Sequence, residues 1–398
     1  MQINNFDFLN SSLSDDNIFN DLNNIIQWIK NLREETGFIV EKKSIFKLKD
    51  WCIKKNNDEI YHSKNIFFSI NGLKTFSSFQ DLDRNEQPII FQEEIGYLGF
   101  IVKKFDGILY FLVQAKIEPG NIDGIQLSPT LQATVSNYNK QHGGREPYYL
   151  NYFLKVSKNN ILFDNLQSEQ GSRFFKKRNR NIIINVEEDI TLEKNFKWMT
   201  LKQLKLLMQK DNIVNMDTRS VISLINYSNL TREEKTYKNY QKFINLVTNG
   251  SIFLKSFSGI YKSKICLEEI IRILIEKKSS NYIKSEIVGL SKIKGWEFNS
   301  YELVNDLKDD FRVIGINASI GSREIFCWDQ PIIEPLNIGL LGLIGKIINN
   351  NLHVIVSLKP EIGTFDVIEF GPTVQLKNQV NKSKDPYHEF ILESKNKK

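Results

Sequence analysis

The chain contains a long internal repeat, and this feature restricts its fold more than any other. When the sequence is compared with itself at an offset of 243 positions, 20 of the 46 residues in 87–132 are identical, where chance gives roughly three. Gln87–Ile90 recurs as Gln330–Ile333, and at an offset of 245 Trp51 recurs as Trp296. The repeating unit spans about 130 residues, which is longer than the units of solenoid proteins. The sequence therefore predicts a duplicated domain.

The repeat divides the 398 residues into three parts. We expect a first unit over residues 1–153, a connecting segment over 154–264 and a second unit over 265–398. Two or three domains also agree with the length of the chain. A chain this long buries about three quarters of its extended surface, so it needs no disulfide or structural metal to fold.

Each unit begins with a helical pattern and continues with strands. Apolar residues recur at helical spacing from Ile18 to Leu32, and again from Leu267 to Ile275. Apolar, strand-like runs follow, and Asp106-Gly107 predicts a hairpin turn between two of them. We therefore expect an α+β fold in which each unit combines a helix with a mixed, mostly antiparallel sheet.

The connecting segment has a different, mixed pattern. Ile182–Ile184 predicts a short buried strand, and Thr200 precedes a helical pattern that runs to Met208. Residues 231–243 carry four basic side chains and predict an exposed, charged helix. This segment is therefore expected to join the two units without repeating either of them.

The composition excludes several classes of protein. Cys52, Cys266 and Cys327 are odd in number and far apart, which excludes a disulfide framework and a four-cysteine zinc site. The most apolar run, Ile338–Ile344, is too short to span a bilayer. Residues 1–16 are polar and acidic, unlike a signal peptide. We therefore expect a cytoplasmic protein that does not bind membranes.

A basic run with aromatic residues inside it lies in the connecting segment. Arg173, Lys177, Arg178 and Arg180 surround Phe174-Phe175. Arginine forks suit the oxygens of a diphosphate, and phenyl rings can stack on a base. Such a run is also typical of a solvated charge cluster or of a nucleic-acid-binding patch. The net charge of +6 is small for a chain of this length and more typical of a solvated surface.

Several longer motifs resemble those of the NDP-hexose 2,3-dehydratases. These motifs are ordered along nearly the whole chain: Gln114–Asn121, Gln126–Thr134, Ser136–Tyr138, Ser168–Asn181, Val214–Ser220, and Gly321–Glu324 with Trp328 and Gln330. The resemblance implies a hydro-lyase of deoxysugar biosynthesis that acts on a nucleotide-linked 4-keto-6-deoxyhexose, usually linked to thymidine diphosphate. It also implies two tandem Nudix-like units and a homodimer.

No cofactor or metal is expected. A Nudix hydrolase holds divalent metal on a helix that carries several glutamates, and Arg33–Gly37 lacks the spacing of that motif. Pyrophosphate hydrolysis is therefore disfavoured. No glycine-rich dinucleotide fingerprint follows a strand either, so a nicotinamide cofactor is not expected.

The two units differ in how much of the family pattern they keep. Glu118–Asn121 of the first unit corresponds to Glu361–Thr364, in which the proline and the asparagine are lost. Thr134–Tyr138 corresponds to Lys377–Asn381, which is not similar. The second unit is therefore the weaker candidate for chemistry.

The implied reaction needs three groups. A base removes the C3 proton, which is acidic because it lies beside the C4 ketone; a donor stabilises the enolate; and an acid protonates the C2 hydroxyl as it leaves. Glu118 is the candidate base and Lys116 the candidate enolate partner, since both follow a strand and are two residues apart. Tyr138 and His142 are the candidate acids. Because Lys116 and Glu118 recur as a pair in the second unit, a purely structural ion pair is an equal alternative.

The same motifs supply the candidate substrate-binding residues. They are Asn121, Gln126, Thr130, Gln132, Ser136, Asn137, Arg173, Lys177, Arg178, Arg180, Arg219, Arg323 and Trp328. Arg219 and Arg323 could instead pair with the acidic residues beside them. Other functions fit the same residues: an epimerase or ketoisomerase that starts from the same deprotonation, a non-catalytic nucleotide-sugar-binding protein, or a nucleic-acid-binding module. We expect a nucleotide sugar rather than nucleic acid as the partner.

Overall fold

The computed structural model describes most of the chain. The described residues are 3–15, 18–79, 82, 85–138, 146–226, 245, 252–257, 263–307, 310–320, 327–377 and 386–395. The fold is α+β, with mixed and antiparallel sheets and few long helices, as the sequence predicts. No helix within these ranges is long and apolar enough to cross a membrane.

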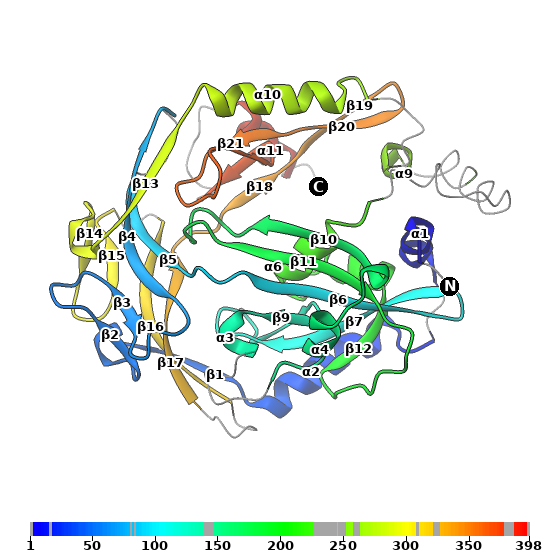
Figure 1. The fold of residues 1–398 in the computed structure, drawn as a ribbon, viewed down its shortest axis with the longest axis horizontal. Coiled ribbons are helices and arrows are strands. Elements are labelled where there is room, and N and C mark those ends of the chain that lie inside the picture. Colours follow the sequence, from blue (N-terminus) through cyan, green and yellow to red (C-terminus); the bar gives the residue numbers. More distant parts are fainter. Residues whose placement is uncertain are drawn as a thin grey trace.

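A seven-stranded sheet forms the centre of the molecule (Figure 1). Its strands are β6 (Gly96–Phe105), β7 (Ile108–Ile117), β8 (Ile125–Ser128), β9 (Leu131–Ala133), β10 (Ile161–Ser168), β11 (Arg178–Asn185) and β12 (Phe196–Thr200). The order is β10-β11-β6-β7-β12, with β8 beside β7 and β9 beside β6. Only the β11–β6 pair is parallel. The strand predicted at Ile182–Ile184 is confirmed as part of β11.

Asp106-Gly107 forms the hairpin turn between β6 and β7, as predicted. Asp106 has φ 48° and Gly107 has φ 81°, and two left-handed central residues match the right-handed twist of the strands. The turn between β19 (Ile344–Ile348) and β20 (Asn351–Ile355) has the same form, with φ 51° at Asn349 and 60° at Asn350.

Two five-stranded sheets lie beside the central sheet, and each takes one strand from the other half of the chain. The first contains β2 (Trp51–Ile53), β3 (Ile60–His62), β4 (Ser69–Ser77), β5 (Glu86–Phe91) and β13 (Ile283–Val288). The second contains β1 (Ile39–Lys43), β14 (Trp296–Phe298), β15 (Leu303–Asn305), β16 (Phe311–Ser319) and β17 (Cys327–Pro335). Thus β1 pairs with β16, and β13 pairs with β4, so backbone hydrogen bonds join residues more than 200 positions apart.

The rest of the second half forms two-stranded sheets. They are β18 (Leu340–Gly342) with β23 (Val374–Leu376), β19 with β20, and β21 (Ser357–Lys359) with β22 (Glu369–Gly371). The second half also contains the helices α9 (Ile252–Phe257), α10 (Leu267–Ser279) and α11 (Pro386–Lys395). Short 3-10 helices occur along the chain at η1 (Ile45–Lys47), η2 (Lys158–Asn160) and η3 (Leu290–Lys292). The helix predicted over residues 231–243 falls outside the described part of the chain.

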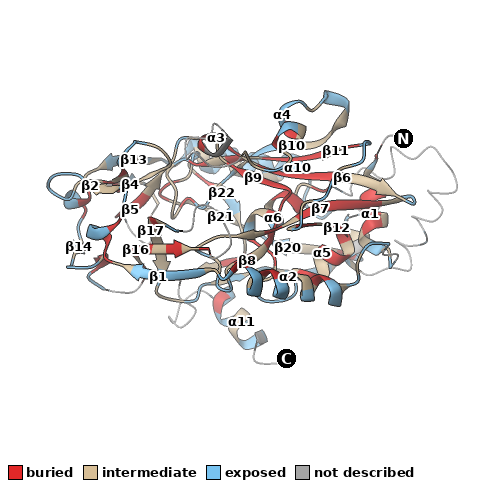
Figure 2. Cartoon of the chain, turned by 90° about the horizontal axis from the view of Figure 1, so that it is seen from below, coloured by how far each residue is buried: buried red, intermediate tan, exposed pale blue. Residues whose placement is uncertain are grey.

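Helices cover both faces of the central sheet (Figure 2). On one face α1 (Asn5–Leu13), α2 (Leu22–Thr36), α5 (Leu201–Leu207) and α6 (Met216–Ile222) share a core with alternate residues of β7, including Phe111 and Val113. On the other face α4 (Leu150–Leu154) packs against Tyr110 and Leu112. Gly99 is required there, because a Cβ at this position would lie 2.2 Å from the ring of Phe153. This packing fixes the ends of the strands, where the candidate site lies.

The helix predicted from Ile18 begins at Leu22 instead. The side chain of Asp21 caps it by accepting a hydrogen bond from the backbone N–H of Asn24, and Gly37 ends it with φ 52°. The helix predicted after Thr200 is confirmed: Thr200 and Gln203 form a capping box at the start of α5. Helix α1 was not predicted from the sequence.

Candidate active site

The candidate residues gather at one end of the central sheet. The pairing of Gly96 with Asn179, of Ile117 with Ile125, and of Tyr97 with Ala133 places the starts of β6, β8 and β11 beside the ends of β7 and β9. Residues that directly flank these strand ends are therefore close in space, although they are far apart in sequence.

Lys116 and Glu118 meet at the end of β7. Lys116 Nζ lies 3.3 Å from Glu118 Oε1 and donates a hydrogen bond of 3.2 Å to the carbonyl of Gln132. The side-chain amide of Gln132, on β9, donates a hydrogen bond of 2.8 Å to the same Glu118 oxygen. All three side chains are partly exposed, so they can meet a ligand.

The start of α6 adds a second carboxyl group. Asn215 caps this helix through its Oδ1, and its Nδ2 donates a hydrogen bond of 3.0 Å to Gln132 Oε1. Burial raises the pKa of Asp217, two residues further on, to about 7, and the negative charges of Glu169 and Glu118 act in the same direction. Two carboxyl groups with different environments can serve as base and acid in one reaction.

Further polar residues lie at the starts of β6 and β11, and one of them, Glu169, acts on the pKa of Asp217. Glu169 is hydrogen-bonded at 2.8 Å by Asn179 Nδ2, and burial raises its pKa above the usual value. Lys177 is buried and donates to the backbone carbonyl of Glu94, and desolvation lowers its pKa. The carboxylate of Glu94 accepts hydrogen bonds of 3.1 Å from both the N–H and the hydroxyl of Ser136. Lys177 and Ser136 therefore hold the sheet end together by contacts inside the protein.

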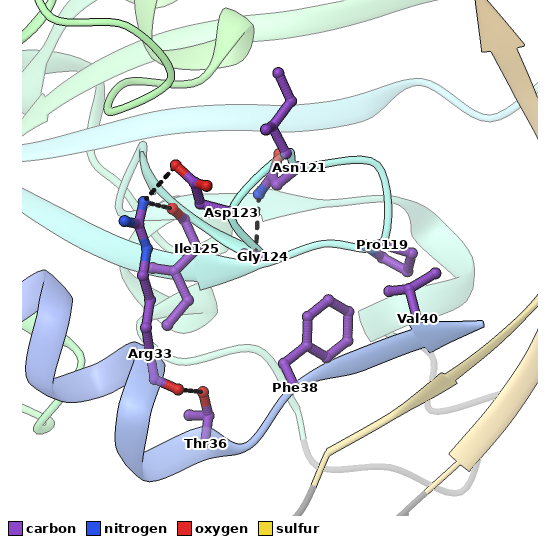
Figure 3. Close-up of a pocket in the computed structure, with 10 residues that line it drawn as sticks. Arg33, Thr36, Phe38, Val40, Pro119, Asn121, Asp123, Gly124 and Ile125 are labelled. Carbon is purple, nitrogen blue, oxygen red and sulfur yellow. Dashed lines mark hydrogen bonds and ion pairs between the residues drawn. The ribbon is translucent and has the colours of Figure 1, made fainter.

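A cavity of about 420 Å³ opens beside the turn between β7 and β8 (Figure 3). Its walls come from the end of α2, the start of β1 and the turn between β7 and β8, and its lining residues are Arg33, Thr36, Phe38, Val40, Pro119, Asn121, Ile122, Asp123, Gly124 and Ile125. The ring of Trp328, on β17, stacks against the lining residue Phe38 at a centroid distance of 6.5 Å. Asn121 and Trp328 are thus brought to one place from different halves of the chain.

The basic run does not form one cationic site. Arg173 pairs with the buried carboxylate of Asp310 at 2.9 Å and stacks on Phe311 at 4.2 Å. Arg178 stacks on Phe365 at 4.0 Å. These contacts fasten the connecting segment to the second half of the chain, which favours a structural role for both arginines over the predicted binding of phosphate.

Two other predicted substrate-binding residues are also engaged inside the protein. Arg180 forms two hydrogen bonds to Asp164, of 2.8 and 2.6 Å. Thr130 is 1% exposed, and its hydroxyl accepts from Ile101 N–H and donates to the carbonyl of Leu112. The hydroxyl of Thr130 thus supports β6 and β7, which favours a structural role over the predicted contact with substrate.

The remaining predicted residues fall into two groups. Gln126 lies on β8 opposite Lys116, and Arg219 Nε donates to the carbonyl of Asn215 at 3.4 Å. The backbone of Asn137 and Tyr138 belongs to α3 (Val135–Tyr138). The side chains of Asn137 and Tyr138, and all of His142 and Arg323, lie outside the described part of the structure.

Sequence reasoning missed four residues of the cluster. Asp217 and Asn215 lie in the family-like motif Val214–Ser220, from which only Arg219 was chosen, and Glu169 lies in the motif Ser168–Asn181. Glu94 lies outside the motifs. Membership in a motif was the available signal, but the sequence does not show which of its side chains face the end of β7.

A family model and three named proteins match most of the chain. The family model for NDP-hexose 2,3-dehydratase matches residues 22–225 and 267–398. A dTDP-4-dehydro-6-deoxy-alpha-D-glucopyranose 2,3-dehydratase of Saccharopolyspora spinosa is 36% identical over 349 residues, which cover 87% of this chain and 70% of that protein. Proteins of the same name from Amycolatopsis orientalis and Streptomyces violaceoruber are 32% and 33% identical, over 87% of this chain and 69% and 74% of theirs.

Solved structures resemble the chain only weakly. An ADP compounds hydrolase gives a TM-score of 0.28 at 14% identity, over 45% of this chain and 93% of that one. The C-terminal domain of mouse MUTYH, in complex with human PCNA, gives 0.23 at 12% identity, over 33% and 87%. Scores this low do not establish a shared fold, whereas the family match covers most of the chain. The chain belongs to the NDP-hexose 2,3-dehydratase family.

Proposed function

We propose that the protein removes water from C2 and C3 of a 4-keto-6-deoxyhexose linked to thymidine diphosphate, in deoxysugar biosynthesis. The names of the relatives support this substrate. The observation that carries the proposal is the pair of carboxyl groups at the end of the central sheet. Glu118 is held by Gln132 and Lys116, while the pKa of Asp217 is about 7.

In the first step the carboxylate of Glu118 takes the C3 proton. The electron pair of the C3–H bond moves toward the C4 ketone, whose oxygen becomes an enolate. The ammonium of Lys116, 3.3 Å from Glu118, supplies positive charge beside the forming enolate. Gln132 keeps the Glu118 carboxylate in a fixed orientation, which a general base requires.

In the second step the ketone re-forms, the C2–C3 double bond forms and the C2 hydroxyl leaves as water. A protonated acid must donate the proton. Asp217 suits this role because burial raises its pKa to about 7, which favours the protonated form compared with an ordinary aspartate. The sequence-based candidates for this acid, Tyr138 and His142, are alternatives.

The product is an enol that converts to a 3,4-diketo-2,6-dideoxy sugar. It gains a proton at C2 from the protonated Glu118 and loses the proton of its C3 hydroxyl to the ionised Asp217. Both carboxyl groups return to their starting states. The cycle transfers no hydride, so we propose no redox cofactor and no metal.

The proposal is tested by incubation of the full-length protein with thymidine diphosphate-4-keto-6-deoxyglucose. We expect a product lighter by one water in the mass spectrum. A product that has lost no water would instead indicate an epimerase or ketoisomerase, which begins with the same deprotonation. Binding without any change in the sugar would indicate a nucleotide-sugar-binding protein.

We also propose that the fold consists of two tandem Nudix-like units, over 1–153 and 265–398, joined by the segment 154–264. Four contacts recur at matching positions and support the duplication. They are Gln132 to Glu118 and Gln375 to Glu361, both 2.8 Å; Arg33 to Asp123 and Lys278 to Asp366; Thr130 to Leu112 and Thr373 to Ile355; and Ile101 to Thr130 and Ile344 to Thr373. We also propose that the protein is cytoplasmic, forms a homodimer and does not bind nucleic acid.

A further inference from the structure

The cavity beside the β7–β8 turn is lined by both apolar and polar side chains. We propose that it receives the nucleoside end of the nucleotide-sugar substrate, an inference that rests on the proposed function. Pro119–Ile125 forms one wall, and Glu118, the proposed base, directly precedes this segment. A ligand in the cavity can therefore extend toward the carboxylate that takes the C3 proton.

The apolar part of the wall suits the faces of a pyrimidine ring. Phe38 and Val40 lie on the β1 side of the cavity, and Pro119 faces them from the turn (Figure 3). Ile122 at the tip of the turn is 76% exposed, although exposure of an isoleucine side chain to water is unfavourable. Flat heterocycles bind between such aromatic and aliphatic side chains because both ring faces are poorly hydrated.

The polar part of the wall suits a neutral group rather than a diphosphate. Arg33 Nη2 lies 3.5 Å from Asp123 Oδ2, so the positive and negative charges that the described residues bring to the cavity offset each other. Among the described residues, Arg33 Nε is buried without a hydrogen-bond partner. The amide of Asn121 makes a single long hydrogen bond, of 3.4 Å, to the carbonyl of Gly124. These groups can pair with the carbonyl and N–H groups of a base or with the sugar hydroxyl.

The matching turn of the second half packs against the connecting segment instead. Phe365, the counterpart of Ile122, lies under the guanidinium of Arg178 at 4.0 Å. Thr364, the counterpart of Asn121, packs against Gly171, where an added Cβ would lie 2.6 Å from its methyl group. The ion pair of Arg33 and Asp123 recurs in the second half and is therefore architectural. Ile122 is more exposed than Phe365, 76% against 55%, and a ligand in the cavity accounts for this difference.

The turn is rigid enough to set the distance between cavity and base. The N–H of Glu118 donates to the carbonyl of Gly124 at 3.1 Å, and the N–H of Asn121 donates to the carbonyl of Glu118 at 3.0 Å. Gly124 has φ +74°, and a Cβ there would lie 2.9 Å from the ring of Phe38. The turn thus closes onto Phe38 and fixes the cavity relative to Glu118, so the diphosphate spans the distance between them.

The test is the affinity of the full-length protein for thymidine diphosphate, measured by titration calorimetry. We expect Ile122→Ser and Asn121→Ala each to weaken binding about tenfold, as loss of one apolar contact or one good hydrogen bond does. The matched control is Ile338→Ser, because Ile338 is 74% exposed but lies in the second half. In turnover assays the loss should appear in KM rather than in kcat, since the cavity holds the end of the substrate that does not react.

Wild-type affinity in both cavity variants would overturn the assignment, and so would an equal loss in Ile338→Ser. The result separates this inference from the proposed function. If the variants lose thymidine diphosphate but the wild-type protein removes no water from the sugar, the cavity assignment stands and the proposed function is wrong. If water is removed and the variants keep their affinity and KM, the cavity assignment alone is wrong.

Discussion

The side-chain amide of Gln132 donates a 2.8 Å hydrogen bond to the carboxylate of Glu118. The pair Gln375 and Glu361 repeats this bond with the same length in the second half. The bond therefore does not distinguish an active site from a structural contact. The first pair has a further partner, since Asn215 donates to the free oxygen of Gln132, and the charge of Glu118 raises the pKa of Asp217 two residues further on.

The two pairs offer a matched test of the base. Glu118→Gln keeps the size and the hydrogen bonding of the side chain but cannot accept a proton, so we expect exchange of the C3 hydrogen with deuterated water to fall by about 10²–10⁴-fold. Glu361→Gln makes the same change in the second half and should exchange at the wild-type rate. Exchange is followed by NMR. A folded Glu118→Gln variant with normal exchange would show that another group is the base.

The pH dependence of water loss tests the acid. Asp217 must be protonated to donate, and its pKa is raised to about 7, so the rate should fall as the pH rises through about 7. Asp217→Asn should still exchange the C3 hydrogen, since Glu118 is intact, but should release water at least about 10²-fold more slowly. If Asp217→Asn keeps both the rate and the pH profile of the wild type, Tyr138 or His142 becomes the candidate.

Arg173 is expected to affect stability rather than substrate affinity. Arg173→Ala leaves the buried carboxylate of Asp310 with Lys377 as its remaining ion-pair partner, at 3.0 Å. We expect the free energy of unfolding to fall by about 2–4 kcal/mol in urea titrations. The control is Arg180→Ala, whose pair with Asp164 is about one third exposed and should cost about 0–1 kcal/mol. Weaker thymidine diphosphate binding with unchanged stability would restore Arg173 to the phosphate site.

Exhaustive chelation should leave turnover unchanged. An elimination beside a ketone needs a base, an acid and an enolate donor, and the chain supplies candidates for all three. Activity is compared before and after treatment with EDTA, with nicotinamide nucleotides omitted. Loss of turnover that one divalent ion restores would show that a metal polarises the ketone.

Several elements could be predicted from the sequence because neighbouring residues determine them. The helical spacing predicts α2 except for its first turn, where the capping side chain of Asp21 places the start at Leu22. Asp106-Gly107 predicts its turn because both positions require left-handed backbone. Lys116 and Glu118 could be proposed as one pair because residues two apart on a strand share a face.

The partners of these residues could not be predicted in the same way. The arginines of the basic run are neighbours in sequence, but their side chains pair with Asp310, Phe365 and Asp164 in separate places. Thr130 lies in a motif that suggested substrate binding, yet its hydroxyl is used inside the sheet.

The sequence by itself determined the internal sequence repeat, the family and the periodicity of the main elements, since each depends on residues compared along the chain. Only the tertiary structure decided that β1 and β13 join the sheets of the opposite halves, and that the charge of Glu118 acts on the pKa of Asp217. The physical reason is that hydrogen bonds, burial and charge act between atoms close in space. The packing of α6 against the end of the central sheet, and not a local pattern, brings those atoms together.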